Sequence, residues 1–95
     1  MSKAFQTVVK TNVHYEYRRE AIDRLIERSE RTALSVIVRT SGLRGEFRRR
    51  ALEGLIDCDA TDELEELAED TAIDPSLRRR AADHVKTGRR SSHAR

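Results

Sequence analysis

Apolar residues recur along this chain at a spacing that predicts helices. Three segments, which begin at Tyr17, Phe47 and Leu77, each carry a large apolar residue, two arginines directly after it, an alanine four positions after it, and a leucine or valine eight positions after it. The offset from the first segment to the second equals that from the second to the third, and no gap is needed to align them. Because residues three or four positions apart lie on one face of an α-helix, each segment is predicted to be an amphipathic helix.

The stretches between these segments repeat at the same offset. Four apolar positions of the first stretch match four of the second: Leu34, Ile37, Val38 and Leu43 correspond to Leu64, Leu67, Ala68 and Ile73. They again describe one helical face. Ala4, Val8 and Val13 fall in the same frame and predict a further helix of this type before the first segment. No segment alternates apolar and polar residues long enough to predict a strand, so the chain is predicted to be all-α.

The period predicts a short α-solenoid of about two and a half helix-pair repeats. We expect one domain at residues 1–87, with a flexible basic tail at 88–95. The domain divides into an N-terminal half-repeat at about 3–13, repeat 1 at about 15–43, repeat 2 at about 45–73 and a final half-repeat at about 75–87. A single helix pair cannot hide its apolar face, so stacked pairs are expected to share a continuous core.

Polar residues at the predicted boundaries indicate where the helices begin. Ser29 and Asp59 occupy equivalent positions just before the second helix of each repeat, where a side-chain oxygen can accept an unpaired backbone N–H. We therefore expect both to be N-caps. Asp74 followed by Pro75 predicts the start of the last helix, because a proline at the first helical position has no N–H to satisfy.

The repeat resembles the HEAT-like repeats, in which an arginine near the start of the first helix is followed by small and then large apolar residues. Its period is similar to that of the compact HEAT-like units named after phycobilisome lyases, whereas longer HEAT and armadillo units run to about 40–47 residues. The resemblance covers about residues 15–86. It implies a protein-binding scaffold without lyase activity, and it implies that Arg18, Arg48 and Arg78 support packing between neighbouring repeats.

Composition narrows the class of protein further. The 95 residues make one small domain with 37% apolar and 38% charged residues. No apolar stretch approaches the roughly 18 residues of a transmembrane helix, and no signal peptide is expected. The single cysteine, Cys58, excludes an internal disulfide framework and favours a cytoplasmic location.

No combination of residues predicts catalysis. The histidines His14, His84 and His93 lie in a connecting segment, the last predicted helix and the tail, and the sequence contains no metal-binding, phosphate-loop or nucleophile motif. We therefore expect a non-enzymatic protein with no metal and no cofactor. Cys58, at a helix end, is expected to have a structural or incidental role.

The net charge of +2 conceals an asymmetry along the chain. Residues 57–74 include nine acidic side chains and no basic one, whereas residues 78–95 include seven basic side chains and one acidic one. Such asymmetry bears on association and solubility rather than on fold. The acidic helix is expected to present a solvated face that is also a candidate for partner binding, formed by Asp62, Glu63, Glu66, Glu69 and Asp70.

The arginines that recur at the repeat spacing have two interpretations, which the sequence leaves open. In the first, they pair with carboxylates of neighbouring helices, such as Glu69, Asp70 or Asp23, and their stems cover apolar surface. In the second, they form a basic stripe that meets phosphates or an acidic protein. The candidate residues of that stripe, two of them in the tail, are Arg19, Arg49, Arg50, Arg79, Arg80, Arg89 and Arg90.

These patterns favour a non-enzymatic adaptor or scaffold that docks onto another macromolecule, a protein first of all, through charged helical faces. The alternative is an accessory RNA- or DNA-binding protein, ribosome-associated for instance, that holds the phosphate backbone with its arginine stripe and basic tail without reading sequence. No membrane is expected among the partners. The exposed ends of the predicted solenoid would also allow a homo-oligomer.

Overall fold

Helices account for most of the chain that the computed structural model describes, namely residues 3–9 and 14–93 of the backbone and residues 3–8 and 14–87 of the side chains. In chain order they are α1 (Lys3–Val9), α2 (Tyr15–Glu27), α3 (Arg31–Arg39), α4 (Gly45–Asp57), α5 (Thr61–Glu69) and α6 (Pro75–His93). No strand occurs in these ranges, which confirms the all-α prediction. Of the predicted N-terminal half-repeat, α1 covers residues 3–9, while residues 10–13 lie outside the described part of the chain.

The helix boundaries follow the period of the sequence. α4 begins and ends at the positions equivalent to the ends of α2, α5 does so relative to α3, and α6 begins at the position equivalent to the start of α4. The same helical face is buried in each copy, because Ala21, Ala51 and Ala81 are all fully buried. A small side chain at this position lets each helix approach its neighbours closely, as dense packing of the interior requires.

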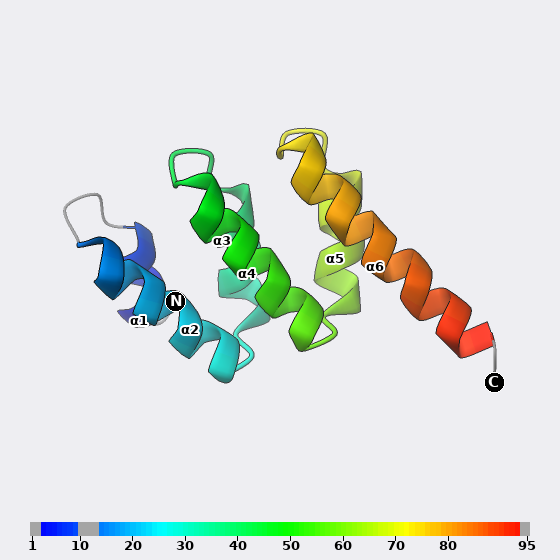
Figure 1. Ribbon diagram of the computed structural model, residues 1–95, viewed down its shortest axis with the longest axis horizontal. Helices are drawn as coiled ribbons and strands as arrows, with labels where there is room; N and C mark the ends of the chain where they lie inside the picture. Colours follow the sequence, from blue (N-terminus) through cyan, green and yellow to red (C-terminus); the bar gives the residue numbers. More distant parts are fainter. Residues whose placement is uncertain (1–2, 10–13, 94–95) are drawn as a thin grey trace.

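The helices lie in two layers (Figure 1). The front helices α2, α4 and α6 lie side by side, and the back helices α1, α3 and α5 lie behind them. The most extensive contacts join α1 to α2, α3 to α4 and α5 to α6. The predicted repeats instead group α2 with α3 and α4 with α5, which also touch but less extensively. Contacts within each layer then join one pair to the next, and the molecule is elongated, at 47 × 26 × 19 Å.

The core runs between the two layers and continues from pair to pair. Helices α1 to α5 all contribute large, fully buried side chains, which are Val8, Ile22, Leu25, Leu34, Ile37, Val38, Phe47, Leu52, Leu55, Leu64 and Leu67. Tyr17 is the one large hydrophobic side chain in the described ranges that is exposed, at 63%. A single exposed apolar side chain is normal on a protein surface, so this residue by itself marks no interface.

The chain reverses direction after α2 and after α4 through the same backbone turn. Ser29 and Asp59 adopt the left-handed conformation, with φ angles of 52° and 53°. After α2, the Ser29 N–H donates to the carbonyl of Ile26 and the Glu30 N–H donates to the carbonyl of Leu25, both at 3.0 Å. This pair of bonds is the Schellman motif, which satisfies the last carbonyls of a helix.

The prediction that Ser29 and Asp59 are N-caps is therefore wrong. The N-caps of α3 and α5 are Glu30 and Ala60, and neither makes a side-chain capping bond. A short polar residue in a tight connection fits two roles, because it can cap the next helix or take the left-handed position that ends the previous one. Here the connection is so short that the two roles fall on adjacent residues. Ser29 and Asp59 occupy the left-handed position that ends the previous helix, and the residue after each of them is the N-cap of the next helix.

Replacing Ser29 by glycine is expected to stabilise the protein by about 0.5–1 kcal/mol. A residue with a Cβ atom pays about 1–2 kcal/mol in the left-handed region, whereas glycine adopts it freely and loses part of that gain to its greater freedom in the unfolded chain. Urea unfolding followed by circular dichroism measures the difference. Ser29→Val, which places a β-branched side chain at the same φ, should lower stability. An equal change in stability for glycine and valine would show that the left-handed conformation of Ser29 is not strained.

Asp74 is the N-cap of α6, as predicted. Its Oδ1 atom accepts hydrogen bonds from the backbone N–H and from the hydroxyl of Ser76, both at 2.8 Å. These bonds favour the ionised carboxylate, so the pKa of Asp74 lies below its ordinary value. Pro75 occupies the first helical position, where its missing N–H costs nothing.

α6 is longer than its counterparts and runs to His93. Residues 88–93, which were predicted to belong to a flexible tail, are thus part of this helix. A single glycine costs a helix only about 1 kcal/mol, and basic residues near a helix C-terminus interact favourably with the helix dipole, so this composition does not stop the helix. The side chains of Arg89 and Arg90 lie outside the described residues, and their role stays a prediction.

Candidate functional site

Two arginines of the predicted stripe join neighbouring front helices. Arg50 Nε donates to Asp23 Oδ1 at 2.6 Å and ties α4 to α2. Arg80 Nε and Nη2 donate to the two carboxylate oxygens of Glu53, both at 3.0 Å, and tie α6 to α4. The two pairs occupy equivalent positions in successive copies of the repeat. The hydrogen bonds that Arg80 donates to Glu53, together with the negative charge of this carboxylate, also raise the pKa of Arg80 above its ordinary value.

Three further arginines of the stripe remain without a carboxylate partner in the described chain. Arg19, Arg49 and Arg79, here called the arginine row, are exposed, and none of them forms an ion pair with a described residue. They lie one on each front helix at equivalent positions. The row therefore places one exposed positive charge on each front helix.

The arginine that precedes the row in each copy has a third environment. Arg18, Arg48 and Arg78 are half-buried, and the Nε atoms of Arg18 and Arg48 are shielded from solvent. Successive residues of a helix point roughly 100° apart, so three consecutive arginines face three different surroundings. The first lies along the core, the second points to solvent, and the third, where a preceding front helix exists, meets an acidic residue on that helix.

A groove of about 350 Å³ lies between α2 and α4 at one end of the arginine row. Its lining residues come from both helices and are Tyr15, Arg19, Glu46, Phe47, Arg49, Arg50 and Glu53. Tyr15 packs against the buried ring of Phe47, with ring centroids 5.1 Å apart, and these two aromatic residues form the apolar part of the groove.

Most charged groups of this groove are already engaged within the chain. The Tyr15 hydroxyl donates to Glu46 Oε2 at 2.7 Å, which raises the pKa of Tyr15. Glu53 and Arg50 take part in the bridges between front helices. Arg19 and Arg49 are the charged residues of the groove that no ion pair within the described ranges compensates. Two such guanidinium groups beside an apolar floor are suited to a carboxylate or a phosphate group.

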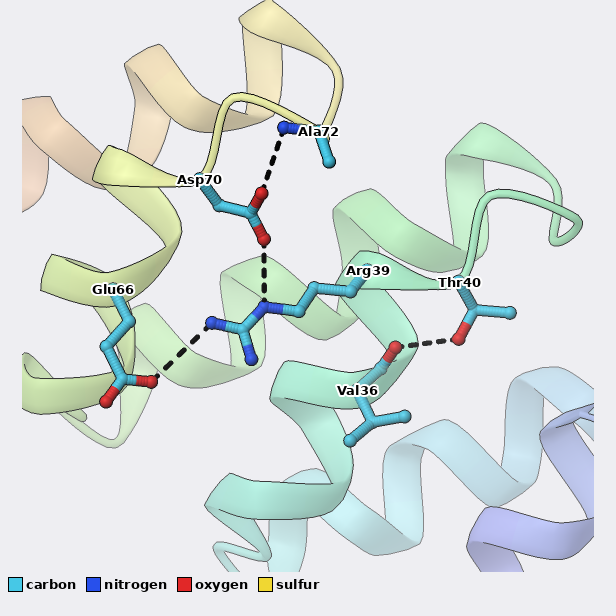
Figure 2. Close-up of polar contacts among 6 residues, drawn as sticks. All are labelled: Val36, Arg39, Thr40, Glu66, Asp70 and Ala72. Atoms are coloured by element: carbon cyan, nitrogen blue, oxygen red, sulfur yellow. Dashed lines mark hydrogen bonds and ion pairs between the residues drawn. The ribbon is translucent and has the colours of Figure 1, made fainter.

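The predicted acidic face is partly neutralised by a basic residue that the sequence did not single out (Figure 2). Arg39, at the end of α3, extends toward α5, where its Nε donates to Asp70 Oδ2 at 3.2 Å and its Nη2 lies 3.5 Å from Glu66 Oε2. The other oxygen of Asp70 accepts the backbone N–H of Ala72 at 2.9 Å and holds the turn after α5. Asp70 and Glu66 therefore connect back helices.

The remaining acidic candidates lie on the same back helix. Asp62 and Glu69 are exposed and Glu63 is half-buried, and none of the three forms an ion pair in the described chain. Because α5 belongs to the back layer, these carboxylates and the arginine row belong to different layers of the molecule. The structure thus brings the row together with one groove and keeps it apart from the acidic helix.

One signal in the sequence could have identified the bridging arginines. An acidic residue is followed 27 positions later by an arginine in two successive copies, Asp23 with Arg50 and Glu53 with Arg80. Arg39 offered no such signal, because the equivalent positions hold Val9 and Glu69. Its pairing with Asp70 depends on how the two back helices pack, which no local pattern reveals.

The other titratable candidates have structural surroundings. His84 is half-buried, with Nε2 3.3 Å from Asp59 Oδ1, and Cys58 Sγ lies 3.6 Å from the carbonyl oxygen of Leu55. Within the described ranges, no group of three His, Cys, Asp or Glu side chains is placed to hold a metal ion. None of the described helices combines the length and the apolar character needed to cross a bilayer.

In comparisons with known proteins, no family model, no curated protein and no solved structure matches the chain.

Proposed function

We propose that this chain is a HEAT-like helical repeat scaffold without enzymatic activity, and that it acts as an adaptor that binds another protein through the arginine row. The recurrence of helix boundaries at one constant period and the alternation of front and back helices support the repeat architecture. A stack of this kind offers an extended surface on which neighbouring helices present equivalent side chains at regular intervals.

The arginine row is the observation on which this proposal depends. Arg50 and Arg80 form ion pairs with acidic residues of the neighbouring helix, whereas Arg19, Arg49 and Arg79 are exposed and form no ion pair with a described residue. What distinguishes the row from other exposed arginines is that its members recur at equivalent positions on the three front helices. Arginine is the residue best suited to a carboxylate partner, because its planar group can donate two parallel hydrogen bonds.

The surroundings of the row favour a protein partner over nucleic acid. α2 carries four acidic and three basic side chains among its 13 residues. Glu16 and Glu20 are exposed on the same helix as Arg19 and would repel a phosphate backbone. A protein surface can match such a mixed pattern residue by residue, while a polyanion requires a continuous basic surface. The partner surface expected here carries carboxylates for the row and an apolar side chain for the Tyr15–Phe47 floor.

The test compares two variants that lose the same amount of charge. Arg19→Gln/Arg49→Gln removes the two row residues that line the groove, and Arg28→Gln/Arg31→Gln removes two exposed arginines elsewhere. Each immobilised protein is incubated with nuclease-treated cell extract, and the captured proteins are quantified by mass spectrometry. We expect the row variant to lose its specific partners by roughly tenfold or more, since a hydrogen bond to a charged group contributes about 1.5–3 kcal/mol.

The control variant should retain the same partners within about twofold of the unaltered protein, since exposed charges outside an interface contribute little. Loss of all partners on nuclease treatment alone would identify nucleic acid as the ligand and overturn the adaptor proposal. Equal capture by the row variant and the control would show that the row is not the docking surface.

A further inference from the structure

We propose that the open side of α2 binds an amphipathic helix of another protein, one that places a basic side chain opposite Glu20 and a small or acidic one opposite Arg24. This surface lies on the side of α2 away from α4, and the inference does not depend on the groove or on the arginine row. It follows from comparing α2 with the equivalent sides of the two other front helices.

Contacts between the front helices show what this side of a helix does. On α4 it presents Phe47, Arg50 and Gly54 toward α2. The ring of Phe47 packs against Tyr15, Arg50 binds Asp23, and the absence of a side chain at Gly54 leaves room for Ile26. α6 uses the same positions toward the preceding elements, with Leu77 buried and Arg80 bound to Glu53. In both helices, this side accepts a helix.

The same side of α2 has no helix against it in the described chain. Tyr17 is equivalent to Phe47 and Leu77, yet it is 63% exposed where they are 1% and 5% exposed. Glu20 and Arg24, which continue this side along the helix, are also exposed. α1 packs behind α2 in the back layer, so it does not fill the position of a preceding front helix.

Charge excludes a second copy of this chain as the occupant. If a copy continued the stack, its α6 would lie against α2 with Asp83 in the place of Asp23 and Lys86 in the place of Ile26. Asp83 would then face Glu20, and Lys86 would face Arg24, so both direct contacts would join like charges. Like charges placed opposite each other at an interface disfavour the association of that pair of surfaces.

A second copy would also offer too little apolar surface. The outward side of α6 carries the exposed Ala82 where α2 and α4 bury Ile22 and Leu52. The two ends of the stack therefore match neither in charge nor in apolar surface, and α2 retains its exposed tyrosine for a different partner.

The contacts between α2 and α4 indicate which side chains the bound helix needs. On α2 the position of Arg50 is held by an acidic residue, so the charge opposite it has to be reversed. A helix seated like α2 on α4 would place an apolar side chain over Tyr17 and, at the position of Asp23, a side chain opposite Glu20. That side chain has to be basic, because Glu20 replaces an arginine. Three residues later, opposite Arg24, the helix carries a small side chain, which leaves room for the arginine, or an acidic one, which pairs with it. Tyrosine is among the residues that contribute most to interfaces of this kind.

The test uses two synthetic helical peptides whose sequence is that of α2 itself, Tyr15–Glu27. One is unmodified, and the other carries Asp23→Lys and Ile26→Glu; both are covalently cross-linked on the remote face so that they are helical in solution. Fluorescence anisotropy measures the binding of each peptide to the full chain. We expect the modified peptide to bind at least tenfold more tightly than the unmodified one.

Variants of the full chain then locate the site. Tyr17→Ala should weaken binding of the modified peptide at least fivefold while leaving the thermal unfolding curve nearly unchanged, because the side chain is exposed. Glu20→Arg should reverse the preference in favour of the unmodified peptide. Arg19→Gln/Arg49→Gln should bind the modified peptide as the unaltered chain does, which separates this site from the arginine row.

Three outcomes would overturn the inference. Equal binding of both peptides, or a preference that Glu20→Arg leaves unchanged, would show that the side of α2 does not select a helix by charge. Dimers of the unaltered chain that Tyr17→Ala dissolves, seen by sedimentation velocity, would make a second copy the occupant.

Discussion

Replacing Leu55 by alanine is expected to lower the free energy of unfolding by about 2–5 kcal/mol. Leu55 is fully buried in α4, the helix that contacts α2, α3, α5 and α6, and it belongs to the hydrophobic core that these helices share. Alanine removes the packed methyl groups and leaves a cavity that surrounding helices cannot close without losing their own contacts. Since small domains are stable by only about 5–15 kcal/mol, this one change would remove a large share of the total.

Urea unfolding monitored by circular dichroism measures this loss, with Tyr17→Ala as the control. The tyrosine is the larger side chain, but it is 63% exposed, and its removal should change stability by less than about 0.5 kcal/mol. A loss below about 0.5 kcal/mol for Leu55→Ala would mean that the side chain is not packed between helix pairs. Equal losses of stability for both variants would mean that Leu55 does not lie on the side of α4 that faces the core.

The helices were predictable because each copy of the repeat buries the same face. Ala21, Ala51 and Ala81 recur at the repeat spacing and all three are fully buried, so spacing alone predicted both the helix type and the buried face. It did not predict every boundary, because α6 continues to His93, beyond the expected end of the domain at residue 87. Periodicity reports which residues face the core. It does not report which helix packs most closely on which, and the closest pairs join each back helix to the front helix that follows it.

The candidate site was predictable only as a set of residues, not as a set of roles. Arg49 and Arg50 are neighbours in sequence and indistinguishable by composition, yet one is exposed and the other binds Asp23. The difference arises from the rotation between successive helical residues and from the position of the preceding front helix. Glu66 and Asp70 likewise belong to an acidic run in the sequence, but Arg39 reaches them from another helix.

The first copy of the repeat departs from the others where no front helix precedes it in the described chain. Three equivalent positions differ between α2 and α4: Tyr17 stands in the place of Phe47, Glu20 in the place of Arg50, and Arg24 in the place of Gly54. At these positions α4 packs against α2, whereas α2 has no front helix against it in the described chain, so the three residues of α2 are exposed. The binding surface proposed on α2 rests on this difference. The contrast between equivalent positions therefore carries functional information that neither the sequence of one copy nor its fold provides alone.

Replacing Gly54 by valine is expected to destabilise the protein by about 1–3 kcal/mol, the usual cost of overpacking a core. A Cβ atom at this position would overlap Ile26 Cγ1 and lie 2.9 Å from its Cδ1, so the side chain of α2 has to move. Valine is the better helix former by a few tenths of a kcal/mol, which is too little to compensate for the clash. The change is measured by urea unfolding.

A second set of variants shows whether Ile26 causes the loss, namely Ile26→Ala and the double variant Gly54→Val/Ile26→Ala. Because Ile26→Ala removes the overlapping atoms, the double variant should be more stable than the sum of the two single losses predicts, by about 0.5–3 kcal/mol. Gly45→Val provides the matched control: a Cβ atom there meets only the end of the flexible Arg48 side chain at 3.8 Å, and stability should hold or rise slightly. Equal effects at both glycines, with no coupling to Ile26, would show that α2 and α4 do not approach through Gly54.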